Sequence, residues 1–201
     1  MQLSGQFDRR SGKPAVRERG AALIEVLVSI LIVAFGLLAL AGLQTRMNAA
    51  LMESFQRAQA LTLVQDITQR LQANRDQYAS YVTASAVGTG DAAPASCTAV
   101  GTRAQIDLCE WSNALKGAAE KSDTNANIGA MIGARGCVEQ LQAPNPAVGI
   151  CQPGKYRLSV VWQGMNATVA PAVTCGQAAY GDEALRKVVS TQVVIPLPSC
   201  S

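Results

Sequence analysis

A single carboxylate lies inside an otherwise apolar run near the start of this chain. The run covers residues 21–43, a stretch of 23 residues in which Glu25 is the only charged side chain. That length matches the roughly 20 apolar residues that a helix needs to cross the hydrocarbon core of a bilayer. A charge in lipid is costly unless it is paired, so Glu25 is expected to have a partner. The chemistry predicted here is charge pairing in an apolar environment.

A secretory signal and an ordinary membrane anchor are the two simpler interpretations of this run. A secretory signal has a shorter apolar core, of about 7–15 residues, and its small-residue cleavage site follows that core. Here the run is longer and the small residue, Gly20, precedes it. An ordinary anchor would have no use for Glu25. The plain anchor stays the main alternative.

The junction from Arg17 to Glu25 resembles the leader-peptidase site of type IV pilins and type II secretion pseudopilins, in which Glu is the fifth residue of the mature chain. The resemblance implies that a prepilin peptidase cuts after Gly20 and that the new amine of Ala21 is methylated. It further implies that Glu25 acts in assembly, next to the N-terminus of another subunit or its own. Such a pair serves registry more than net stability.

Shorter segments resemble minor pilins of the PilV type, called type IV pilus modification protein; they are residues 107–115, 160–164 and 186–189. This resemblance implies a minor pilin that helps initiate or prime type IV pilus assembly and is incorporated near the tip. Implied partners are other minor pilins, the major pilin, the prepilin peptidase, the inner membrane and a tip adhesin. A minor pseudopilin of a type II secretion system is the alternative. Ala21 in place of Phe and Gly42 in place of Pro disfavour a major subunit.

Positive charge is concentrated ahead of the apolar run. The chain has 17 Lys and Arg against 14 Asp and Glu, and residues 1–20 hold five of the former and two of the latter, so the remainder balances at 12 each. By the positive-inside rule the N-terminus stays in the cytoplasm. We therefore expect one pass through the bacterial inner membrane, a periplasmic head and, after assembly, a place in the pilus. No nucleic-acid partner is expected, since the remainder lacks a dense basic patch.

All six cysteines lie in the C-terminal half, at Cys97, Cys109, Cys137, Cys151, Cys175 and Cys200. An even number in an exported segment predicts disulfides. No CxxC spacing and no His occur, so neither a metal nor another cofactor is expected. Fifteen connectivities are open. The working expectation is sequential pairing, 97–109, 137–151 and 175–200.

No enzyme is predicted. Without His the Ser-His-Asp and Cys-His arrangements are unattainable. The carboxylate pairs Asp182-Glu183 and Asp107/Glu110 are interpreted as solvated surface.

The apolar run continues into an amphipathic stretch, which predicts one helix over residues 21–73. Its apolar face is expected to consist of Met47, Leu51, Phe55, Ala58, Leu61, Val64, Ile67 and Leu71, with Gln56 and its polar neighbours largely on the other side.

A loop is predicted over residues 84–101, a short helix over 103–116 with Trp111 in the core, and weak structure over 117–136. Alternation predicts a strand over 156–163, and Val-rich sequence predicts another over 185–195. A further short strand is expected over 137–141. The fold class is α+β and pilin-like, a long N-terminal helix packed on a small antiparallel sheet with a disulfide-stapled head. The expected parts are a leader (1–20), a membrane and filament-core helix (21–48), its amphipathic continuation (49–83) and the periplasmic head (84–201).

Overall fold

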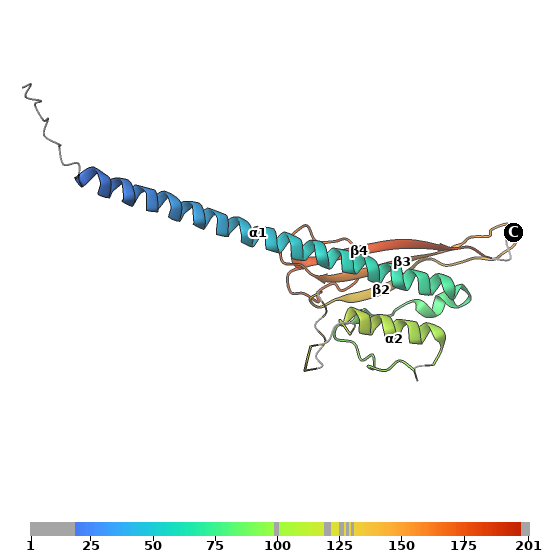
Figure 1. Ribbon diagram of the computed structural model, residues 1–201. Helices are drawn as coiled ribbons and strands as arrows, with labels where there is room; N and C mark the ends of the chain where they lie inside the picture. Colours follow the sequence, from blue (N-terminus) through green and yellow to red (C-terminus); the bar gives the residue numbers. More distant parts are fainter. Residues whose placement is uncertain are drawn as a thin grey trace, which may run out of the picture. The chain divides into compact units, whose positions relative to one another are not determined.

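The computed structural model describes residues 19–98, 101–118, 122–124, 127, 129 and 131–197. The described part of the chain divides into two compact units, with the boundary between residues 47 and 48. Helix α1 (Arg19–Ala73, 55 residues) contributes to both. No Pro interrupts it, and the predicted helix over 21–73 is confirmed, with its start two residues earlier. Figure 1 draws α1 without a break.

In the first unit, every described side chain from Ala22 to Met47 is exposed. Among the described residues, α1 is the one helix that is both long enough and apolar enough to cross a membrane.

The second unit combines the rest of α1 with a four-stranded antiparallel sheet in the order β1-β2-β3-β4. Its further elements are η1 (Arg75–Tyr81), β1 (Val87–Gly88), α2 (Arg103–Leu115), β2 (Arg135–Gln142), β3 (Gly154–Gln163), η2 (Glu183–Leu185) and β4 (Arg186–Ile195). The predicted α+β pilin-like fold is confirmed. The sequence analysis did not predict β1, which lies in the predicted loop over residues 84–101. It predicted the strand that corresponds to β2, but with a start two residues too late.

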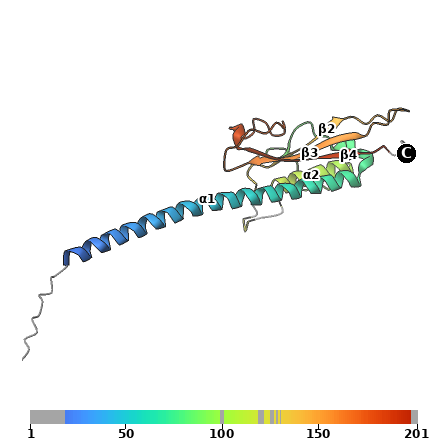
Figure 2. The same cartoon turned by 90° about the horizontal axis from the view of Figure 1, so that it is seen from above.

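The core forms where α1 crosses one face of the sheet. Four alternating β3 residues pack against one stripe of α1; they are Tyr156, Leu158, Val160 and Trp162, against Ala60, Val64, Ile67 and Leu71. Gln56 accepts a hydrogen bond from Trp162 Nε1 at 3.1 Å, and farther along the chain the ring of Tyr78 lies 5.4 Å from that of Tyr156. Within this unit α1 therefore runs antiparallel to β3 and in the same direction as β4. In Figure 2, α1 and α2 lie on the same side of the sheet.

Helix α2 completes this layer. It begins with a capping box, in which Thr102 Oγ1 accepts from Gln105 N and the Gln105 side chain accepts from Thr102 N. Trp111 is fully buried, as predicted, and its Nε1 donates to the carbonyl of Leu63 at 2.9 Å. The indole ring lies over Gly136 of β2, where any side chain would overlap it.

The predicted apolar face of α1 is wrong over its first half. Met47, Leu51, Phe55 and Leu61 are exposed, as is Ala58. Gln56, expected on the polar side, is instead 1% exposed. The reason is that the indole N–H of Trp162 needs an acceptor at this depth, and Gln56 supplies it. The buried stripe thus starts at Gln56 and Ala60, and the prediction holds for Val64, Ile67 and Leu71.

Candidate assembly site

Glu25 lies on the exposed surface of α1, one helical turn after Ala21. Ser29 Oγ donates to the backbone carbonyl of Glu25 at 2.7 Å. In the part of the chain that the structure describes, no group donates to the Glu25 carboxylate. Gly20 is helical, and Ala21 is four residues before Glu25, so a free amine at Ala21 would lie on the same helix face as the carboxylate.

Around Glu25, α1 exposes apolar side chains on every face. Leu23, Leu27 and Phe35 are each 65–69% exposed. A helix that is apolar all round belongs in lipid or among other helices.

The second unit carries a related surface, which we call the α1 stripe and define as Leu51, Met52, Phe55 and Leu61. These side chains are 44–62% exposed and lie off the face that covers the sheet. Neighbouring large apolar groups exposed together are typical of an interaction site. The α1 stripe offers that surface for packing against another helix.

An ionic cluster holds α1, η1 and α2 together. Arg70 Nε donates to both carboxylate oxygens of Asp66 at 3.0 Å, and Arg70 Nη1 contacts Asp107 at 3.1 Å and Glu110 at 2.5 Å. Arg103 contacts Asp107 at 2.9 Å. Burial alone would lower the pKa of Arg70, but the hydrogen bonds to Glu110, Asp66 and Asp107 outweigh it and raise the pKa.

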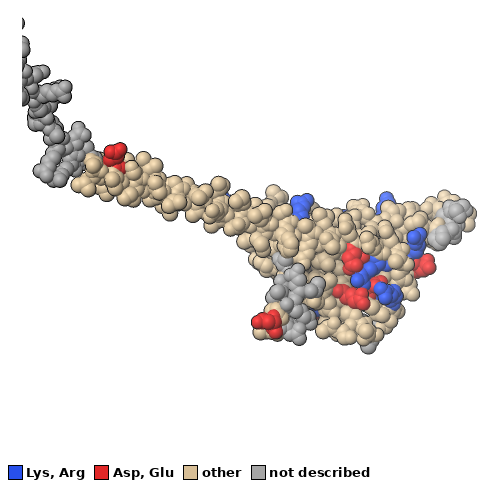
Figure 3. All heavy atoms as spheres, in the orientation of Figure 1, with Lys and Arg blue, Asp and Glu red and all other residues tan. Residues whose placement is uncertain are grey.

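Asp107 is buried in this cluster and accepts a hydrogen bond from the hydroxyl of Tyr81. Burial and that bond raise the pKa of Tyr81 to about 12. The interpretation of Asp107 as solvated surface was therefore wrong. Asp182 is exposed, as predicted, and it caps η2 by accepting from Ala184 N at 2.9 Å. Glu183 is partly exposed and accepts from Arg186 Nε at 2.6 Å. On the face shown in Figure 3, side chains of both signs gather on the head.

A second cluster fixes the loop that precedes α2. Asp91 accepts from Ser112 Oγ at 2.6 Å and from Gly88 N at 2.7 Å, and it forms an ion pair with Lys116. Burial by itself would raise the pKa of Asp91, but these bonds and one from Ala93 N lower it to about 2.

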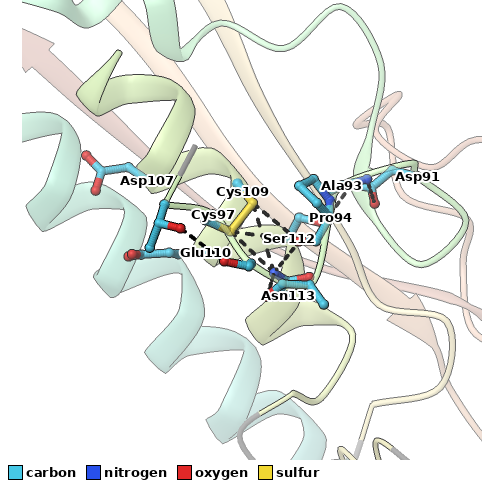
Figure 4. The surroundings of a disulfide bond; sticks show 12 residues. Asp91, Ala93, Pro94, Cys97, Asp107, Cys109, Glu110, Ser112 and Asn113 are labelled. Carbon is cyan, nitrogen blue, oxygen red and sulfur yellow. Dashed lines mark hydrogen bonds between the residues drawn. A yellow bond between two sulfur atoms is a disulfide. The ribbon is translucent and has the colours of Figure 1, made fainter. Parts of the chain in front are cut away.

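The disulfide Cys97–Cys109 ties the same loop to α2, with Cα atoms 5.7 Å apart. Asn113 lies beside it and donates to the carbonyl of Pro94 at 2.8 Å (Figure 4). This pair matches the sequential pattern.

The sequential pattern is wrong for the next cysteines. Cys137 of β2 pairs with Cys175, 38 residues away, rather than with Cys151, and this pair excludes 175–200 as well. The physical reason is that the segment after β3 folds back over the sheet, where Cys137, Cys175, Val161 and Tyr180 form a small core. Cys151 is disulfide-bonded, and Cys200 lies outside the described residues.

Arg186 secures this folded-back segment. It is 2% exposed and donates to the carbonyls of Pro171, Val173 and Cys175 at 2.5–3.1 Å. Sequence reasoning missed the roles of Arg70, Asp91 and Arg186 because most of their partners lie 11 or more residues away and carry no local pattern. Within the described ranges, no group of three His, Cys, Asp or Glu side chains is placed to hold a metal.

Comparison with known proteins gives one family. The family described as Tt1218-like, "Type IV pilin Tt1218", matches residues 42–114, from the middle of α1 almost to the end of α2. No curated protein and no solved structure gives a significant match. The family match supports a pilin role and suggests a structural protein that assembles with other pilins. It also fits a membrane-anchored chain, because the matched range follows directly on the apolar half of α1.

Proposed function

We propose that this chain, similar to type IV pilins over residues 42–114, is a minor pilin of the PilV type that helps to initiate pilus assembly. The observation that carries the proposal is the apolar part of α1 from Ala22 to Met47, where every side chain is exposed in the described structure, together with the lone carboxylate of Glu25. Such a surface gains stability only in a bilayer or among other apolar helices.

The first step is maturation at the inner membrane. A prepilin peptidase removes residues 1–20 by cutting after Gly20, whose missing side chain leaves the peptide bond accessible. The freed amine on Ala21 is then methylated. Residues 21–48 hold the processed chain in the membrane, and the head lies in the periplasm.

The second step is association with other subunits. The amine of Ala21 and the carboxylate of Glu25 pair across neighbouring α1 helices, which fixes their axial register, because a mismatched register leaves a charge unpaired in an apolar environment. The α1 stripe then packs on the helix of the next subunit. Partners are other minor pilins and the major pilin, and the filament position is near the tip, beside an adhesin.

The test replaces Glu25 with Ala in the full chain, in cells whose own copy of the gene is deleted. We expect the variant to reach the membrane at the normal level, to be processed, and to be absent from sheared pili. Ser29→Ala is the matched control, because Ser29 bonds only to a backbone carbonyl.

Three outcomes contradict the proposal. Normal piliation and incorporation by Glu25→Ala would remove the registry role. An intact Met1 in N-terminal sequencing of the membrane form would exclude cleavage after Gly20. Loss of secretion with normal twitching motility after gene deletion would indicate a minor pseudopilin of a type II secretion system instead.

A further inference from the structure

The outer edge of β4 carries a row of backbone groups without partners among the described residues. Gly164 N donates to Leu185 O at 2.8 Å, which makes this pair a hydrogen-bonded pair of the β3–β4 ladder. Bonded and non-bonded pairs alternate along an antiparallel ladder. The residues of β4 that bond to β3 are therefore Lys187, Val189, Thr191, Val193 and Ile195.

The intervening residues direct their N–H and C=O groups away from the sheet. They are Val188, Ser190, Gln192 and Val194, and none of these backbone groups bonds to another segment in the described part of the chain. Gln163 N supplies an independent check, since it donates to Ile132 on the β2 side at 2.9 Å. Odd-numbered β3 residues thus face β2 and even-numbered ones face β4.

This edge lacks the features by which proteins usually block pairing with other chains. No charge, Pro or Gly occurs from Val188 to Ile195, and the register with β3 is continuous over ten residues. A long, regular and uncharged edge strand readily accepts another strand.

The opposite edge of the sheet is closed. β1 covers Arg135 and Gly136, and Thr83 bonds to Val138 through N–H at 3.0 Å and through its hydroxyl at 3.1 Å. The register beyond these residues shifts between Gln140 and Gln142, which disrupts further pairing. The contrast makes β4 the one open edge among the described strands.

We propose that β4 accepts an extended, uncharged β-strand from a different subunit of the same assembly, so that the sheet continues into that subunit. The occupant is a strand because only an extended chain presents backbone groups at the two-residue spacing of this edge. It is uncharged because the eight residues it lies beside offer no ion pair. This inference rests on the proposed role in an assembly.

A second copy of this chain fits the edge poorly. Antiparallel pairing of two β4 edges would set the two head segments of α1 in opposite directions, because α1 and β4 run the same way within the head. Parallel pairing of the two edges would set these segments on opposite faces of the joined sheet, so that they could not pack on each other. Subunits anchored in one membrane need their α1 helices in the same direction. The closed β2 edge of a second copy offers no strand either.

The test uses the full chain, co-produced pairwise with each other pilin-like subunit of its own cells and extracted from membranes in detergent. Ser190→Pro and Gln192→Pro remove outward N–H groups and leave the bonds to β3 in place. Ser190→Ala and Gln192→Ala are the matched controls, since they change the side chain alone. We expect each Pro variant to weaken co-purification of one subunit about tenfold relative to its Ala control.

Amide hydrogen exchange of the unsubstituted chain gives a readout that needs no variant. The amides of Val188, Ser190, Gln192 and Val194 are expected to exchange more slowly in the complex than in the chain alone. If the Pro variants misfold, this measurement decides.

Three outcomes would overturn the inference. The folded Pro variants could co-purify a subunit as well as their Ala controls do, amide exchange at the β4 edge could be unchanged in the complex, or no subunit could co-purify at all. A photo-crosslink from position 192 to a second copy of this chain would also overturn it. The proposed function is tested separately, because its failure would appear as absence of the chain from sheared pili. The β4 edge is tested in complexes extracted from membranes, so the two results can be told apart.

Discussion

Single polar residues set the local stability of the head, and Asp91 is the clearest case. Its carboxylate gathers four donors from β1, its own loop and the end of α2. Each donor would be left without its partner if the charge were lost, so the loop before α2 depends on an ionised Asp91.

The pH dependence of this site follows from the direction of the pKa shift. The pKa of Asp91 is lowered from 3.8 to about 2, so its stabilisation is present above about pH 4 and is lost as the pH falls through about 2. We expect Asp91→Asn to lower the free energy of unfolding by about 2 kcal/mol at pH 7.

Urea unfolding of both proteins at pH 7 and at pH 2 measures this effect. The difference between wild type and variant should shrink at the lower pH. A difference that is the same at both values would show that Asp91 acts through shape rather than charge.

Gln56 gives a second prediction, because it satisfies a buried donor. Gln56→Ala leaves the indole N–H of Trp162 without this acceptor in the core, and we expect a loss of about 2 kcal/mol of unfolding free energy. Trp fluorescence during urea unfolding reports it. Arg57→Ala, on the exposed side of the same turn, should change stability little; an equal loss there would point to a general effect on α1.

The two disulfides with assigned partners connect different secondary-structure elements of the head. Cys97–Cys109 closes a short segment between a loop and α2, whereas Cys137–Cys175 joins β2 to the segment after β3. The residue separations are 12 and 38. Loop-closure entropy grows with the length of the closed segment, so the second bond restricts the unfolded chain more.

We therefore expect the double variant Cys137→Ala/Cys175→Ala to lose more stability than Cys97→Ala/Cys109→Ala, by about 4 against about 3 kcal/mol. Thermal unfolding of both under the same oxidising buffer makes the comparison. The reverse order would mean that the loop before α2 depends on its disulfide for packing as well as for entropy.

Local periodicity was enough to predict most of these elements. Uninterrupted apolar and amphipathic sequence predicted α1, and two-residue alternation predicted β3 and which of its faces meets α1. The predictions that were wrong concern features that depend on residues far away in the sequence. The buried face of α1 is set by Trp162, about a hundred residues later in the chain, and the pairing of Cys137 by the path of the segment after β3.

The same difference between local signals and distant contacts applies to the candidate functional features. Glu25 was found because a charge inside an apolar run is unusual in itself. The open edge of β4 was not found, because a strand's sequence does not say whether it ends a sheet.

For the whole molecule, the division into two units has a direct consequence. The main core begins at Ala60 on α1, and none of its members comes from residues 1–47. The apolar half of α1 should therefore add little to the stability of the head.

We expect a chain that starts at residue 48 to keep the disulfides of the full protein and its unfolding temperature within about 2 °C. It should also remain in solution without detergent. Calorimetry of this fragment beside the full chain in detergent is the measurement. A fragment that unfolds much earlier would show that the first unit supports the core.

The order of pairing along the chain also bears on how the protein matures. On the proposed route into the periplasm, Cys151 emerges before Cys175, yet Cys137 is bonded to Cys175. An oxidase that links thiols as they emerge would first make the wrong bond. On that route, correct maturation calls for thiol–disulfide exchange that reopens such an early bond.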